Sequence, residues 1–133
     1  MTDFDLPEPI QAAIAAEAAR ALPREACGVL LGNMAEGSLQ VTRHRPVQND
    51  TVTSASYAIP GDVVLAIQRE GEQDGVDVVG FYHSHPHGPA GPSPTDLEHA
   101  LPGFLYVIAD ARTGMVTAWR LRDDRRAFEP ADG

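Results

Sequence analysis

The segment VDVVGFYH, residues 76–83, constrains the fold more than any other part of the chain. Its apolar side chains fall on both of the faces that alternate along an extended strand, so both faces must be covered by other parts of the protein. A strand of this kind lies in the middle of a sheet, and such a sheet needs helices packed against it. The segment therefore predicts a central strand in a sheet that is flanked by helices.

The rest of the chain supplies those helices and further strands. Residues 8–22 are rich in alanine and carry an apolar stripe, which predicts a helix. Asp62 is expected to cap a second helix over 63–74 that Gly75 closes, and a short helix is expected over 95–100. Further strands are expected over 27–32, 39–44, 57–59, 104–109 and 115–122. Because strands and helices alternate irregularly, the expected fold is α/β in the broad sense: an α+β arrangement with a single mixed sheet flanked by helices.

Composition narrows the classes of protein that the chain can belong to. Its 133 residues fit one domain over residues 1–133, and 43% hydrophobic with 22% charged residues is typical of a globular protein. No apolar run reaches the roughly 18–20 residues that span a bilayer, and the first ten residues do not read as a signal peptide. The net charge of −9 disfavours nucleic acid and anionic membranes as partners.

The number of cysteines indicates the redox environment of the protein. Cys27 is the single cysteine, which excludes an internal disulfide and a cysteine-based structural zinc site. One cysteine without a disulfide partner is typical of a reducing compartment, so a cytoplasmic location is expected. We expect Cys27 to be a small buried hydrophobic residue in the strand over 27–32.

Four of the five histidines fall in the segment HSHPHGPAGPSPTDLEH, which begins at His83. His83 and His85 stand two apart at the end of the central strand, so both imidazoles point to one side of the sheet. Asp96 lies beyond a loop rich in proline and glycine that can fold back on the pair. Two imidazoles and one carboxylate leave one tetrahedral position open, which is the pattern of a catalytic zinc site. The sequence therefore predicts one Zn²⁺ per chain.

The same residues also have a purely structural interpretation. The run from Ser93 to Asp96 is a good capping box, with Ser93 as the N-cap of the short helix. The two histidines alone could equally mark the half-exposed end of a strand. Capping and metal binding can coexist, because a helix N-terminus favours an ionised carboxylate.

The pattern of the whole segment resembles a known signature. His-x-His, seven residues, Ser, two residues and Asp is the motif of the JAMM (MPN-plus) metalloproteases, which also require an upstream glutamate near a CGLLLG-like strand. Here Glu25 precedes CGVLLG. The resemblance extends over nearly the whole chain and is to short bacterial members of the family. It implies the MPN/JAMM (cytidine-deaminase-like) fold.

The resemblance also implies a role for each residue. His83, His85 and Asp96 would bind zinc, and Glu25 would activate the zinc-bound water and pass its proton to the leaving amine. Ser93 would donate a hydrogen bond to the oxyanion. Without the downstream motif, Glu25 would be read as a solvated carboxylate between a helix and a strand.

Family members hydrolyse amide or isopeptide bonds after the C-terminal Gly-Gly of ubiquitin-like proteins, and the short bacterial members are thought to act on sulfur-carrier proteins. The implied function is therefore a zinc-dependent isopeptidase whose partner is a ubiquitin-like or sulfur-carrier protein. Three alternatives are a peptidase of cell-wall or general peptides, a non-catalytic MPN binding module, and an iron oxygenase with two histidines and one carboxylate. His87, where bacterial relatives often carry an acid, is expected to face solvent.

Overall fold

The structure is a computed structural model that describes residues 4–48, 59–87 and 89–131, except for the side chains of Thr95 and His99. The expected strand over 57–59 falls mostly outside these ranges. In chain order the elements are β1 (Phe4–Asp5), α1 (Glu8–Ala21), β2 (Cys27–Ala35), β3 (Ser38–Val47), α2 (Gly61–Gln73), β4 (Asp77–His85), α3 (Pro94–His99), β5 (Leu105–Asp110), β6 (Val116–Leu121) and β7 (Phe128–Pro130).

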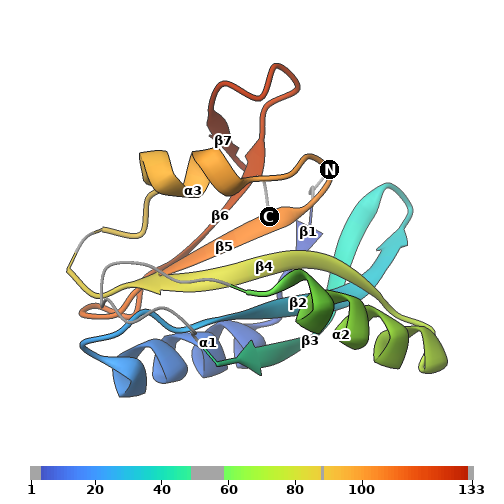
Figure 1. The fold of residues 1–133 in the computed structure, drawn as a ribbon, viewed down its shortest axis with the longest axis horizontal. Coiled ribbons are helices and arrows are strands. Elements are labelled where there is room, and N and C mark those ends of the chain that lie inside the picture. The colour runs from blue at the N-terminus through green and yellow to red at the C-terminus, as the bar shows by residue number, and fades with distance from the viewer. Residues whose placement is uncertain (1–3, 49–58, 88, 132–133) are drawn as a thin grey trace.

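The strands form one mixed sheet in the order β1-β3-β2-β4-β5-β6-β7 (Figure 1). Strand β4 is in its centre, antiparallel to β2 on one side and parallel to β5 on the other. The prediction of a two-sided central strand in a single mixed sheet flanked by helices is therefore confirmed.

Helices α1 and α2 cover opposite faces of this sheet (Figure 1). Ile14 and Ala18 of α1 pack into a core cluster that contains Leu30, while Ile67 of α2 packs into a second cluster that contains Val29. Neighbouring residues of β2 thus serve different cores because side chains alternate across a strand. Burial on both faces explains why β2 and β4 are apolar at consecutive positions.

Three expectations need correction. Strand β4 does not end at residue 83 but continues through His85, because Ser84 and His85 pair with the parallel strand β5. Asp62 does not cap α2: the N-cap is Pro60, without a side-chain cap, and Asp62 lies in the first turn. Strands β1 and β7 were not expected, since segments of two and three residues are too short to show a periodic pattern.

On the face of β4 that packs against α1, a buried tyrosine forms a hydrogen bond to the helix. Tyr82 is 1% exposed, and its hydroxyl donates a hydrogen bond of 2.7 Å to Glu17 Oε1 of α1. Its ring lies over Gly28 of β2, where a Cβ atom would be 2.3 Å from the ring. Glycine is therefore required at position 28 to make room for the tyrosine.

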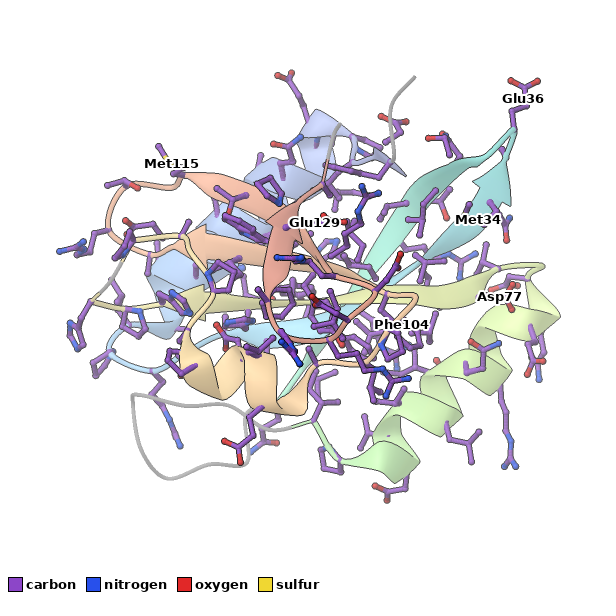
Figure 2. The ribbon with its side chains drawn as sticks, turned by 90° about the horizontal axis from the view of Figure 1, so that it is seen from above. Met34, Glu36, Asp77, Phe104, Met115 and Glu129 are labelled. Atoms are coloured by element: carbon purple, nitrogen blue, oxygen red, sulfur yellow. The ribbon has the colours of Figure 1, made fainter. Side chains whose placement is uncertain are left out.

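Among the described residues, Met34 and Met115 are the two most exposed of the large hydrophobic side chains. Figure 2 shows them on opposite sides of the molecule, so they do not share an apolar patch. No helix among the described residues is long and apolar enough to cross a membrane.

Candidate active site

His83 and His85 lie on the face of β4 opposite Tyr82, as the alternation of side chains requires. Their Nε2 atoms are 3.2 Å apart. The side chain of His83 is 2% exposed and that of His85 is 15% exposed. Two imidazole nitrogens therefore converge on one point beneath the protein surface.

Asp96 reaches the same point from the first turn of α3. Its Oδ1 lies 3.0 Å from Nε2 of His83, and its Oδ2 lies 3.3 Å from Nε2 of His85. The predicted capping box is also present: Asp96 N donates to Ser93 Oγ at 3.1 Å, and Ser93 N donates to Asp96 Oδ2 at 2.8 Å. The structural and the functional interpretation of this motif thus hold together, because the box orients the carboxylate toward the histidines.

These distances are compatible with a tetrahedral zinc site. Zinc bonds nitrogen and oxygen ligands at about 2.0–2.1 Å, so two ligands on a tetrahedron lie about 3.3 Å apart. The two Nε2 atoms are 3.2 Å apart, and each lies 3.0 or 3.3 Å from an oxygen of the Asp96 carboxylate, His83 from Oδ1 and His85 from Oδ2. Two imidazoles and one carboxylate are also the donor types that catalytic zinc sites use.

The protonation states of the three side chains favour metal binding at two of them. Burial alone would raise the pKa of Asp96, but hydrogen bonds from His83 and His85 outweigh it and hold that pKa well below its ordinary value. Burial lowers the pKa of His83, which keeps its imidazole neutral. The hydrogen bond to Asp96 raises the pKa of His85, so a proton competes with a metal chiefly at His85.

His85 is oriented by a chain of hydrogen bonds from the C-terminal half of the protein. Its Nδ1 lies 2.9 Å from the carbonyl oxygen of Pro89, which can only accept, so Nδ1 carries the proton and Nε2 is left for the site. The next carbonyl, that of Ala90, accepts from the hydroxyl of Thr117 on β6, and Trp119 Nε1 donates to Thr117 Oγ1 at 2.8 Å. No sequence pattern indicated Thr117, because its partner lies 27 residues away.

Glu25 lies just before β2 and is 5% exposed, so its interpretation as a solvated carboxylate is wrong. One of its carboxylate oxygens lies within 4.8 Å of a ring nitrogen of both His83 and His85. Burial raises the pKa of Glu25 to about 7; His85 opposes this rise and the charge of Asp96 adds to it. A carboxyl group with this pKa can both accept and release a proton near neutral pH.

A buried serine joins the strand of the histidines to the segment of Glu25. Ser84, which is 1% exposed, lies between His83 and His85 on β4. Its backbone N–H donates to the carbonyl of Ala26 at 3.0 Å, and the N–H of Ala26 donates to Ser84 Oγ at 2.8 Å. Sequence analysis did not select Ser84, because nothing in the motif distinguishes it from a spacer.

Three other side chains were considered from the sequence. Ser93 Oγ accepts the capping hydrogen bond with a lone pair, so its hydroxyl proton remains a possible donor. Cys27 is 1% exposed as expected, and it lies opposite His83 in the register of β2 and β4. His87 is exposed, in agreement with the expectation that it faces solvent.

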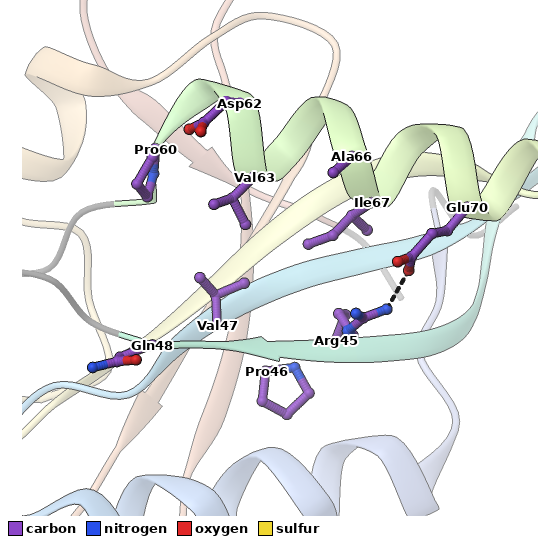
Figure 3. A pocket seen from close by; sticks show the side chains of 10 residues that line it. All are labelled: Arg45, Pro46, Val47, Gln48, Pro60, Asp62, Val63, Ala66, Ile67 and Glu70. Atoms are coloured by element: carbon purple, nitrogen blue, oxygen red, sulfur yellow. Dashed lines mark hydrogen bonds and ion pairs between the residues drawn. The ribbon is translucent and has the colours of Figure 1, made fainter.

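A pocket of about 460 Å³ lies between β3 and α2 (Figure 3). Val47 pairs in register with Cys27, and Cys27 pairs with His83, so the Val47 end of the pocket is on the same sheet face as the histidines. At the other end, Arg45 and Glu70 form an ion pair of 2.5 Å. The pocket is lined by Arg45, Pro46, Val47, Gln48, Pro60, Asp62, Val63, Ala66, Ile67 and Glu70.

Comparisons with known proteins show to which family and fold the chain is similar. A family model described as prokaryotic homologs of the JAB domain matches residues 7–122. A desampylase of Haloferax volcanii is 39% identical over 98 residues, which cover 72% of this chain and 68% of the relative. A CysO-cysteine peptidase of Mycobacterium tuberculosis is 40% identical over 123 residues, which cover 91% and 78%. A solved structure from Desulfitobacterium hafniense has a TM-score of 0.85 at 24% identity, covers 97% of this chain and 90% of its own, and shares the fold.

Proposed function

Since the chain belongs to the family of prokaryotic homologs of the JAB domain, we propose that it is a zinc-dependent peptidase of ubiquitin-like or sulfur-carrier conjugates. The bond hydrolysed is the amide that follows the C-terminal glycine of the carrier. The observation that carries this proposal is the convergence of two imidazoles and a carboxylate, with a second buried carboxylate beside them.

In this proposal His83, His85 and Asp96 hold the metal. Asp96 is suited to this role because its hydrogen bonds keep it ionised, and His83 because burial keeps it neutral. A zinc ion held by these residues would lower the pKa of a coordinated water to about 7 and would polarise the scissile carbonyl. The protein contributes the orientation of the ligands and a site largely screened from solvent.

Glu25 then acts as general base and general acid. Its carboxylate takes a proton from the attacking water and delivers that proton to the nitrogen of the leaving amine. Without metal, burial raises the pKa of Glu25 to about 7, and this burial favours the protonated carboxyl that must later deliver the proton. A role as a fourth metal ligand is less suitable, because it would fill the position that water needs.

Ser93 is proposed to stabilise the oxyanion. Its oxygen is fixed at the N-cap of α3 by the N–H of Asp96, which leaves the hydroxyl proton free to donate to the substrate. A donor of this type typically contributes about 3–4 kcal/mol to the transition state.

The substrate class is inferred from the relatives and the pocket. One relative is named a desampylase and another a CysO-cysteine peptidase, and we take both names to indicate a conjugate of a carrier protein as substrate. An extended C-terminal tail can lie in the pocket between β3 and α2, whose Val47 end is on the same sheet face as the histidines. The leaving group is then either the amino group of cysteine or a lysine side chain.

Two substitutions separate the proposed roles. Asp96→Ala should abolish zinc binding, measured by metal analysis after dialysis, and with it turnover. Glu25→Gln should retain one zinc per chain but lower kcat by at least about 10³-fold. Glu98→Gln, which changes an exposed glutamate on α3, is the matched control and should retain both properties.

The substrate is tested by mass spectrometry on a carrier–cysteine and a carrier–lysine adduct. Release of the intact carrier by zinc-loaded protein is the expected result. Cleavage of cell-wall or general peptides with neither adduct cleaved would refute the carrier as substrate. Oxygen uptake with bound iron, and no hydrolysis, would refute peptidase chemistry altogether.

A further inference from the structure

Ser84 links the strand of the proposed metal ligands to the segment that carries the proposed base. It separates His83 from His85 along β4, and its cross-strand partner Ala26 follows Glu25 directly. Ser84 and Ala26 are both buried, with exposed fractions of 1% and 8%. The hydrogen bonds between them therefore form away from water, where each contributes to fixed geometry.

One of the two hydrogen bonds between Ser84 and Ala26 departs from the regular antiparallel pattern. In a regular antiparallel ladder, two opposed residues exchange both N–H groups with both carbonyl oxygens. Here Ser84 N donates to the carbonyl of Ala26 as expected, but Ala26 N donates to the hydroxyl oxygen of Ser84. The hydroxyl thus replaces the backbone carbonyl at the point where the chain before β2 departs from the sheet.

This departure determines where Glu25 lies. Because Glu25 is bonded directly to Ala26, a shift of the Ala26 amide moves the carboxylate relative to the histidines. A carboxylate that must reach a water beside the metal tolerates little displacement, since about 1 Å of misplacement can lower a rate about 100-fold.

We propose that Ser84 is a positioning residue: its hydroxyl holds the Ala26 amide so that Glu25 stays at the proton-transfer distance from the metal site. This inference rests on the proposed function for the role of Glu25. Ser84 stands at a variable position of the motif, so the motif alone does not predict this role.

Ser84→Ala tests the inference. Without the hydroxyl, the buried N–H of Ala26 either loses its partner or pairs with the carbonyl of residue 84, and either change displaces Glu25. We expect kcat to fall 10- to 100-fold, while KM and the zinc affinity stay within about 3-fold of the wild type. Ser84→Thr retains the hydroxyl and should recover most of kcat.

The matched control is Ser38→Ala, which removes another buried serine hydroxyl at the opposite end of the sheet and should leave kcat unchanged. A Ser84→Ala protein with wild-type kcat and only a lower melting temperature would overturn the inference, since the hydroxyl would then be structural. A parallel loss of zinc affinity would also overturn it, since Ser84 would then act through the ligands.

A second measurement needs neither turnover nor a variant. In the wild-type protein the Ala26 amide should exchange with deuterium as slowly as the amides in the middle of β2, although it lies before the strand. Fast exchange would overturn the inference even if the variants fail to fold. If the wild type cleaves neither adduct while the Ala26 amide is protected, the proposed function fails and the hydrogen bond remains established.

Discussion

Glu25→Gln should stabilise the metal-free protein at neutral and alkaline pH. The ordinary pKa of a glutamate is 4.5, and burial raises that of Glu25 to about 7 in the folded chain. Folding therefore favours the protonated carboxyl, and the stability that this provides is complete below pH 4.5 and is lost as the pH rises toward 7. Glutamine resembles the protonated form at every pH and avoids this loss.

The structure sets the size of the effect. A difference of one unit between the folded and unfolded pKa values corresponds to about 1.4 kcal/mol, so ionisation of Glu25 destabilises the folded protein by about 3 kcal/mol. The buried amide of glutamine must replace the hydrogen bonds of a carboxyl group, which reduces the gain by about 1 kcal/mol. A net gain of about 2 kcal/mol at pH 8 corresponds to about 7 °C in Tm for a chain of 133 residues.

The assay is a set of thermal melts of chelator-treated wild type and Glu25→Gln between pH 4.5 and 8.5. The difference in Tm should be near zero or slightly negative at pH 4.5 and should grow to about +7 °C at pH 8. Zinc should remove the advantage, because a nearby cation favours the ionised carboxylate. Glu98→Gln, at an exposed position, should change Tm by less than about 2 °C throughout.

A difference in Tm that does not depend on pH would refute the reasoning, because it would mean that burial does not shift the pKa of Glu25. The same conclusion would follow if the wild type were the more stable protein at pH 8 without metal. A stabilising substitution at a proposed catalytic residue is the expected compromise between stability and activity.

Three further predictions concern the scaffold of the site. Gly28→Ala should lower the free energy of unfolding by more than about 2 kcal/mol in thermal melts, because the new methyl group would lie 2.3 Å from the Tyr82 ring. Gly61→Ala is the control and should be tolerated, because position 61 has open space around it. Thr117→Val should weaken zinc binding about 10-fold in a chelator competition, because valine lacks the hydroxyl that donates to the carbonyl of Ala90 in the loop after His85. Thr117→Ser retains this hydroxyl and should not weaken zinc binding. Tyr82→Phe should cost about 1–2 kcal/mol and raise the pKa of Glu17 further in an NMR titration, because the carboxylate of Glu17 loses its phenol donor.

Local spacing accounts for what could be predicted from the sequence. The period of two along β4 places His83 and His85 on one face, and the capping box fixes how Asp96 leaves the first turn of α3. Both depend on residues within a few positions of one another. The central strand could be predicted for the same reason, since its two-sided apolar pattern reports burial directly.

Long-range pairing accounts for what could not be predicted. The extension of β4 through His85 depends on β5, which lies 25 residues further along the chain. The hydrogen bond between Ser84 and Ala26 joins residues 58 positions apart. The burial of Glu25 likewise depends on how the segment before β2 returns over the histidines, which no local pattern encodes.

The pKa values of the two carboxylates of the site are shifted in opposite directions, and this difference matches the roles proposed for them. Asp96 and Glu25 are both largely withdrawn from water, which by itself raises the pKa of each. Asp96 accepts hydrogen bonds from two imidazoles and from the Ser93 backbone, so it remains ionised and suits a cation. Glu25 keeps a pKa of about 7, so it suits a group that carries a proton. Exchanging the two roles would require a ligand that is half protonated at neutral pH and a base too weak to take a proton from water. The electrostatic environment therefore supports the same assignment as the motif, on independent physical grounds.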